Sequence, residues 1–141
     1  MNIRKMKKED QNAVAVLLDQ LGYPDTGEFI AQKIKNLLND PDEYLTVVEN
    51  SEGKVTAFIS IHIIPQIALK GDFARISYFS VDENFRSSGF GKQLEEYCEK
   101  IARTRKCDRI EVHCNGKREK AHQFYYRQGY TESPKYLIKK L

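Results

Sequence analysis

Residues 81–92 contain the side chains and backbone types from which an anion-binding site can be built. The segment follows a predicted strand and opens a predicted helix, and the first turn of a helix presents free amides and the positive end of a dipole. Gly89 and Gly91 let the backbone approach a ligand closely. Side chains that can cap the helix, donate to a phosphate or add positive charge lie around them: Arg86, Ser87, Ser88 and Lys92. The segment therefore predicts a phosphate cradle, and a glycine-containing helix start without a ligand is the alternative.

The spacing of this segment differs from two well-known nucleotide loops. The third glycine of a dinucleotide-binding turn is missing at its offset, and no Gly-Lys-Ser/Thr follows as in a nucleoside-triphosphate loop. The ligand class therefore depends on the rest of the chain.

The elements before the segment are predicted to form two helices and a meander. Apolar residues at helical spacing predict helices over about 9–21 and 25–38, and Asp25 with Glu28 resembles a helix-capping pair. Short or alternating apolar runs predict strands at 1–6, 44–49, 55–63 and 73–81. The last three strands should pair antiparallel because their connections are too short for crossovers.

After the segment the pattern changes to strand, helix, strand. A helix is predicted over about 90–102, a strand over 109–114 and a last helix over 118–128, which Gly129 ends in a left-handed conformation. The order gives a βαβ crossover, so its two strands should be parallel. Short strands are predicted at 130–132 and 135–140. The predicted fold class is α/β (α+β): a mixed sheet of six to seven strands flanked by four helices, in one domain over residues 1–141.

The composition is that of an ordinary globular chain. With 141 residues, 40% apolar and 30% charged, it can bury a core without a disulfide or metal staple. Cys98, Cys107 and Cys114 cannot all pair, and no spacing of cysteine or histidine suggests a metal, so we expect reduced thiols in a cytoplasmic protein. No signal-peptide pattern and no apolar run of about 20 residues is present, so no membrane partner is expected.

Basic residues cluster in the second half of the chain, although the net charge is only +3. Their two interpretations are a solvated surface and an electropositive rim that attracts a phosphate-rich ligand. Acidic residues interrupt the cluster, so nucleic acid is not an expected partner. The basic residues are Lys100, Arg103, Arg105, Lys106, Arg109, Lys117, Arg118 and Lys120.

Two motifs together resemble a known family. Arg86-Ser-Ser-Gly89-Phe-Gly91 resembles the Arg/Gln-x-x-Gly-x-Gly/Ala loop of the GNAT N-acetyltransferase superfamily. Ala121-His-Gln-Phe-Tyr125-Tyr-Arg-Gln-Gly-Tyr130 resembles that family's Ala-x-x-Phe/Leu-Tyr-x-x-x-Gly-Phe/Tyr signature. The resemblance covers essentially the whole chain, and residues 115–125 look most like the aminoalkylphosphonate acetyltransferases.

The resemblance implies acetyl-CoA as co-substrate, with no metal. Its pyrophosphate would lie on the loop and helix start, at Arg86, Ser87, Ser88, Gly89, Phe90, Gly91 and Lys92. Ser87 stands where the family often has glycine. The pantetheine arm would pair with the strand before the loop, at Phe79, Ser80 and Val81. Asn115 would meet the pantetheine or the substrate, and a turn residue is its alternative role.

The resemblance also assigns the proton transfers. Tyr125 matches the tyrosine that protonates the departing thiolate, and a phenol with a pKa of ~10 suits a thiolate of ~8.5. Relatives often use a strand glutamate as base, but that position here is Tyr78, and no carboxylate lies between Phe73 and Val81. The candidates for the base are Tyr78 through a water, His113, Glu111 and His62, with His113 preferred. Glu111 and His113 share a face of the predicted strand by period-2 alternation, so they could act together or pack together.

The expected function is acetyl transfer from acetyl-CoA to a primary amine of a small molecule. The connection at residues 23–28 is expected near the acceptor, although Asp25 and Glu28 fit helix capping better. A protein lysine or N-terminus as acceptor, and a non-catalytic acyl-CoA sensor, are the alternatives. The resemblance also allows a homodimer.

Overall fold

The computed structural model describes residues 2–133 and 135–141. The chain divides into two compact units, residues 1–111 and 112–141, and each is described by itself. Within the described residues, no helix has the length and apolar character needed to cross a bilayer.

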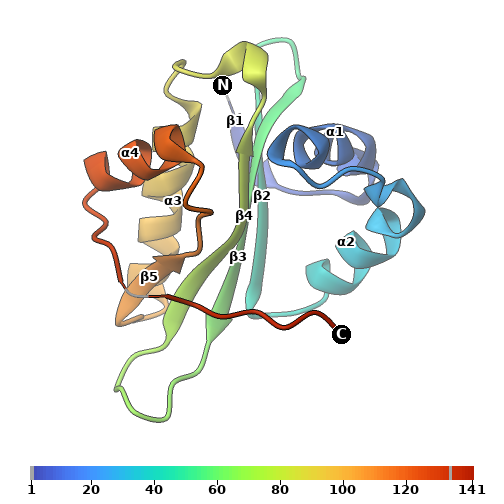
Figure 1. The fold of residues 1–141 in the computed structure, drawn as a ribbon. Helices are drawn as coiled ribbons and strands as arrows, with labels where there is room; N and C mark the ends of the chain where they lie inside the picture. The colour runs from blue at the N-terminus through green and yellow to red at the C-terminus, as the bar shows by residue number, and fades with distance from the viewer. Residues whose placement is uncertain (1, 134) are drawn as a thin grey trace. The chain divides into compact units, whose positions relative to one another are not determined.

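The first unit is built on a sheet whose strands lie in the order β1-β2-β3-β4-β5. β1–β2, β2–β3 and β3–β4 pair antiparallel, as the predicted meander requires. β4 and β3 form the long middle of the sheet (Figure 1). The strands are β1 (Asn2–Lys5), β2 (Glu43–Glu49), β3 (Val55–Ile64), β4 (Phe73–Val81) and β5 (Arg109–Val112), the last ending one residue into the second unit.

The prediction of six to seven strands is wrong for the described residues, where the sheet has five. The strands predicted at 130–132 and 135–140 are absent, since the described residues there have no strand conformation. The described residues from 131 onward are all exposed. An apolar alternation gives a strand only when a neighbouring strand supplies ladder hydrogen bonds and a face to bury.

The helices of the first unit begin and end close to the predicted positions. α1 (Gln11–Leu21) follows the short turn η1 (Lys8–Asp10), and α2 (Ile30–Leu38) follows η2 (Thr26–Glu28). η3 (Glu83–Phe85) connects β4 to α3 (Phe90–Thr104). The predicted capping by Asp25 is wrong: Asp25 has a left-handed backbone (φ 62°), precedes only the η2 turn and makes no side-chain cap.

Two layers of helix cover the sheet of the first unit, with α1 and α2 on one face and α3 on the other (Figure 1). Beneath α1 and α2, residues of the helices and of β2 and β3 form one buried cluster that includes Leu17, Ile34, Leu45 and Phe58. α3 packs on β3 and β4 through its buried residues Leu94, Cys98, Ile101 and Ala102. Cys98 is therefore a core residue, as predicted, and burial raises the pKa of its thiol to about 12.

The second unit contains α4 (Glu119–Arg127). Gly129 follows it with φ 94°, which confirms the predicted left-handed helix end. The Tyr130 amide donates to the carbonyl of Tyr125, and the two rings meet edge to face with their centres 5.3 Å apart. Tyr125 is only 8% exposed, so this unit holds its signature tyrosine inside an aromatic cluster.

Candidate active site

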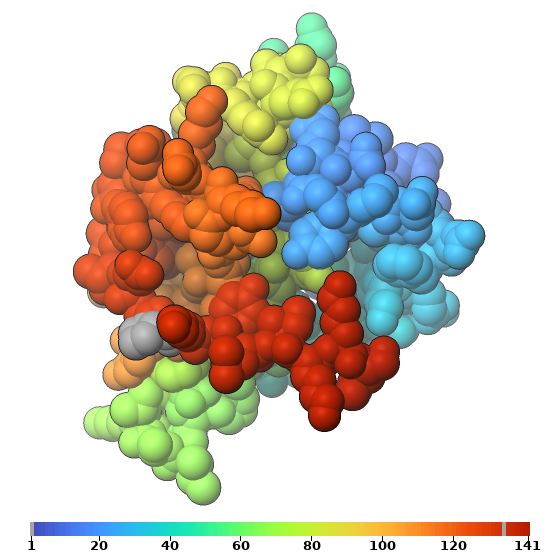
Figure 2. All heavy atoms as spheres, in the orientation of Figure 1, coloured from blue at the N-terminus to red at the C-terminus, as the bar shows by residue number. Residues whose placement is uncertain are grey.

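The connection from β4 to α3 is held at its beginning by Asp82. The Asp82 amide donates to Thr56 of β3, and its carboxylate accepts from the amide of Asn84 (2.9 Å). Further on, the rings of Phe85 and Phe90 stack with centres 6.2 Å apart. These contacts fix both ends of the loop, while residues 86–89 are exposed. The loop forms part of the molecular surface, coloured yellow in Figure 2.

Two left-handed residues shape this loop. Ser87 has φ 67° and Gly89 has φ 84°. Gly89 occupies the N-cap position of α3, and no side chain caps the helix, so the predicted capping by Ser87 or Ser88 is wrong. A left-handed backbone is less favourable in free energy for serine than for glycine, because serine has a Cβ atom. The loop thus holds a backbone conformation that Ser87 alone would not favour.

The start of α3 presents donors to an anion. The first helical hydrogen bond of this turn runs from the Gln93 amide to the Gly89 carbonyl, so the three preceding amides have no acceptor inside the helix. Arg86 and Lys92 are exposed beside them, and Arg86 Nε contacts the Val81 carbonyl at 3.3 Å. Amides, helix dipole and two cations act in the same direction and suit a phosphate group.

Three arginines near or beyond the other end of α3 are held in ion pairs away from this site. Arg103 pairs with Glu99, Arg105 with Asp42 and Arg109 with Asp108, at 2.5–2.8 Å. A helix rises about 1.5 Å per residue, so Arg103 lies about 20 Å from Gly89 along α3. For these three arginines the solvated-surface interpretation holds, and the electropositive rim does not.

β4 carries a bulge where the family places its base. The register with β3 shifts between Ser60 and Ile61, so Ser77 is an extra residue beside Tyr78. Bulges re-aim side chains and often lie next to active sites. Tyr78 is 40% exposed, and its ring meets that of Tyr23 edge to face at 5.3 Å. The connection after α1 therefore lies against this part of β4.

The three residues after the bulge are firmly placed. Ser80 is buried, and its hydroxyl donates to the Leu17 carbonyl of α1 at 3.0 Å. Ala57, Phe58 and Ile59 of β3 lie opposite them. The residues predicted to receive the pantetheine arm, Phe79, Ser80 and Val81, thus belong to a rigid strand.

A row of charged side chains crosses the sheet below the bulge. Glu43 of β2 lies opposite His62 of β3, and His62 lies opposite Arg75 of β4. Glu43 Oε1 is 2.5 Å from His62 Nδ1, and Arg75 donates to Glu111 at 2.6 Å. Burial raises the pKa of Glu43, and the neighbouring His62 opposes that rise. The sequence did not predict this row, because the alternation of apolar residues does not determine which residues of two strands lie opposite each other.

The remaining candidates lie in the second unit. β5 ends at Val112, so the predicted strand to Cys114 is two residues too long and the alternation argument does not reach His113. The His113 ring stacks on Tyr136 at 4.3 Å. Asn115 forms a turn, since its side chain accepts from the Lys117 amide (2.9 Å), as its alternative role predicts. A contact of Asn115 with pantetheine stays a prediction, as does the acid role of Tyr125.

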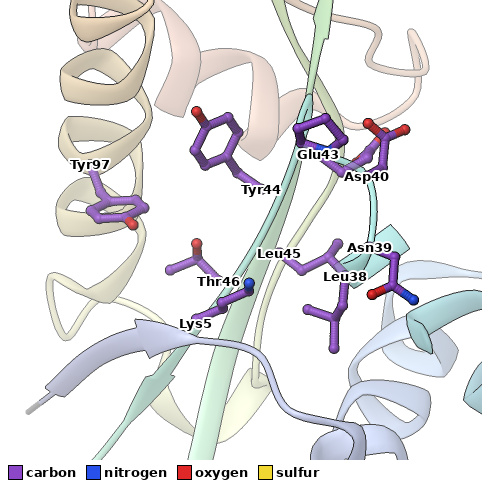
Figure 3. A pocket seen from close by; sticks show the side chains of 10 residues that line it. Lys5, Leu38, Asn39, Asp40, Glu43, Tyr44, Leu45, Thr46 and Tyr97 are labelled. Carbon is purple, nitrogen blue, oxygen red and sulfur yellow. The ribbon is translucent and has the colours of Figure 1, made fainter. Parts of the chain in front are cut away.

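A hollow of about 410 Å³ lies elsewhere, at the β1–β2 edge of the sheet. Figure 3 shows Tyr97 of α3 on one side of β2 and Leu38 and Asn39 on the other. The hollow is separated from β4 by β3. Among the residues described, no cluster of three or more metal-ligating side chains occurs. The residues that line the hollow are Lys5, Leu38, Asn39, Asp40, Pro41, Glu43, Tyr44, Leu45, Thr46 and Tyr97.

Comparison with known proteins gives consistent results. Residues 11–130 match the sequence model described as "Acetyltransferase (GNAT) family". An aminoalkylphosphonate N-acetyltransferase of Salmonella typhimurium is 29% identical over 133 residues, which cover 93% of this chain and 85% of that protein. Glucosamine-6-phosphate N-acetyltransferase from Arabidopsis thaliana superimposes with a TM-score of 0.84 at 24% identity, covering 99% and 97% of the chains. An aminoglycoside 6'-N-acetyltransferase from Acinetobacter baumannii gives 0.84 at 17% identity, with the same coverage.

Proposed function

Because this chain belongs to the GNAT acetyltransferase family and is an N-acetyltransferase, we propose that it transfers the acetyl group of acetyl-CoA to the primary amine of a small molecule. The observation that carries the proposal is the start of α3, where amides without an acceptor in the helix lie beside Arg86 and Lys92. A pyrophosphate satisfies such donors and both cations at once. The protein is proposed to act in the cytoplasm.

The cofactor is proposed to lie along β4 and the loop. Its pyrophosphate would contact the residues from Arg86 to Lys92, and the pantetheine arm would follow Phe79, Ser80 and Val81. The left-handed backbone at Ser87 supports this assignment, because it keeps the geometry of a loop in which relatives often have glycine. Asn115 is the proposed further contact.

The proposed reaction is a direct attack of the amine on the thioester. The nitrogen forms a bond to the acetyl carbon, the carbon–sulfur bond breaks, and the amine loses a proton. Tyr125 would give a proton to the departing thiolate. The sequence-derived candidates for receiving the amine's proton are His113, Tyr78 acting through a water, Glu111 and His62.

The proposed acceptor is a small amine that also carries an acidic group. The relative from Salmonella is named for aminoalkylphosphonates and matches 93% of the chain, which supports that class. Tyr23 packs against Tyr78, which supports a position for the acceptor between the α1–η2 connection and β4.

The test is release of free thiol from acetyl-CoA against a panel of amines. The panel contains aminoalkylphosphonates, polyamines, aminoglycosides, amino acids and lysine peptides. We expect turnover with aminoalkylphosphonates, and Tyr125→Phe should lower kcat by about 10²-fold while leaving acetyl-CoA affinity by calorimetry unchanged. Turnover with lysine peptides alone would point to a protein acceptor. Binding of acetyl-CoA without turnover would favour the sensor.

A further inference from the structure

The charged row below the bulge lies on the same sheet face as Tyr78. Leu45 and Phe58 belong to the cluster under α1 and α2, and side chains two residues apart on a strand share a face. Glu43 and His62 therefore point to this face, and so does Tyr78, which lies opposite Ser60. His62 and Tyr78 are diagonal neighbours, about 7–8 Å apart in Cα position.

The helices leave this part of the face accessible. The side chain of His62 is 36% exposed and that of Arg75 is 34% exposed. Glu43 behind them is only 9% exposed. His62 can therefore meet a ligand on this face, and Glu43 can act only through His62.

The polar groups of this row are not satisfied by the protein alone. Glu43 Oε2, His62 Nδ1 and Arg75 Nε are buried and lack a well-directed hydrogen-bond partner among the described residues. Nδ1 lies 2.5 Å from Glu43 Oε1, which is an ion-pair contact when the ring is protonated. Buried polar atoms of this kind are rare and call for an explanation. All three lie in one row, next to the position that lacks the family's glutamate.

Resting on the proposed function, we infer that His62 is the base that deprotonates the acceptor amine, and that Glu43 is the positioning residue that orients its ring. With Nδ1 toward the carboxylate, Nε2 is the ring nitrogen left to accept a proton. The pair supplies at His62 the proton acceptor that β4 lacks between Phe73 and Val81.

The proton balance is complete. The ammonium of the acceptor, or a water bound to it, gives one proton to His62, and the neutral amine attacks the thioester. The nitrogen loses its second proton as the amide forms, and this loss is balanced by the proton that the thiolate takes up to become the free thiol, so the net release is the one proton on His62. The side chain of His62 is 36% exposed, so the proton that it takes up can pass directly to bulk water.

Arg75 and Glu111 end the row on the other side. Arg75 is paired with Glu111, so with His62 neutral the four groups carry a net charge of −1 from their formal charges. This favours arrival of a cationic ammonium over an anion at His62. Tyr78 and the Tyr23 ring above it form the apolar side of the same surface.

The test is the pH dependence of kcat/KM for thiol release with aminoethylphosphonate and acetyl-CoA. The rise of activity with pH reports the group that must lose its proton. In His62→Gln we expect kcat/KM to fall about 10²-fold and the rise near neutral pH to disappear. In Glu43→Gln we expect kcat to fall with little change in KM, because the ring loses the carboxylate that orients it, and Glu43→Asp should restore most of the lost activity.

Matched variants decide between this assignment and its rivals. His122→Gln on α4 serves as the control and should keep the wild-type profile. Far-UV circular dichroism and acetyl-CoA affinity establish that each variant is folded. An active wild type whose pH profile is unchanged in His62→Gln overturns the assignment, and loss of the rise in His113→Gln instead would give the role to His113. A wild type inactive with every amine overturns the proposed function itself.

Discussion

Gly71→Ala should destabilise the first unit by forcing two backbone segments apart. A Cβ at Gly71 would lie 2.7 Å from both the Asp108 amide nitrogen and the Lys106 carbonyl oxygen. Both are backbone atoms, so no side-chain rotation can relieve the contact. The same place holds the hydrogen bond from the Asp108 amide to the Asp72 carbonyl (2.8 Å), which ties the start of β5 to the start of β4.

The magnitude follows from the overlap. Real Cβ atoms essentially never lie closer than 3.0 Å to another heavy atom, so at 2.7 Å from two backbone atoms the backbone must move. Overpacking of this kind costs about 1–3 kcal/mol. For a chain of this size, 1 kcal/mol lowers Tm by roughly 2–4 °C, so a fall of about 2–12 °C is expected.

Gly27→Ala is the matched control for this change. Nothing lies within 4 Å of its Cβ position, and Gly27 has no left-handed backbone. It should therefore be neutral or stabilise the protein by up to about 1 kcal/mol through the unfolded chain. The assay is urea unfolding followed by circular dichroism, with the free energy extrapolated to water. A Gly71→Ala protein within about 0.5 kcal/mol of the wild type would show that this contact does not constrain the fold.

Two further substitutions, at Asp10 and at Ser87, test contributions of single residues to stability. Asp10 accepts two hydrogen bonds from Arg4 (2.8 and 2.9 Å), and these lower the pKa of the Asp10 carboxyl in the folded protein. The ionised carboxylate therefore stabilises the fold above its unfolded pKa of about 4, and this stabilisation is lost as the pH falls through the lower folded pKa. Asp10→Asn should thus cost about 1–3 kcal/mol at pH 7 and progressively less in acid, by urea unfolding at several pH values; an equal cost at all pH values would contradict this. Ser87→Val should lose about 1–2 kcal/mol because a β-branched residue is strained at φ 67°, whereas Ser88→Val, which has no positive φ, should not; equal thermal stability of the two variants would refute the argument.

Local sequence patterns predicted the ends of helices, because a helix end depends on residues that are adjacent in the sequence. α3 begins at Phe90 as expected, because a glycine pair and an amphipathic repeat together specify a helix start. Gly129 is left-handed as expected, since a helix end needs that conformation and glycine adopts it at little cost. The strands expected after Gly129 are absent, because a strand depends on a partner that its own sequence does not encode.

Some parts of the candidate site could be predicted from the sequence and others could not. The loop from Arg86 to Lys92 was predicted, because its glycines, cations and helix start are contiguous in sequence. The pairing of Glu43 with His62 and the ion pair of Arg75 with Glu111 were not, because they depend on cross-strand register. The bulge at Ser77 sets that register on β4, and no residue type marks it. His62 was among the candidates for the base only as a histidine on a strand.

The burial of Cys98 has a practical consequence for labelling the protein. Alkylating and disulfide-exchange reagents react with thiolates, and burial raises the pKa of the Cys98 thiol to about 12. Burial also raises the pKa of Cys107 and Cys114, which are partly exposed. All three cysteines should therefore be slow to modify while the chain is folded. A chromogenic thiol reagent should then report mainly the thiol released from acetyl-CoA, and a rapid stoichiometric burst of labelling would mark the fraction of molecules that has unfolded.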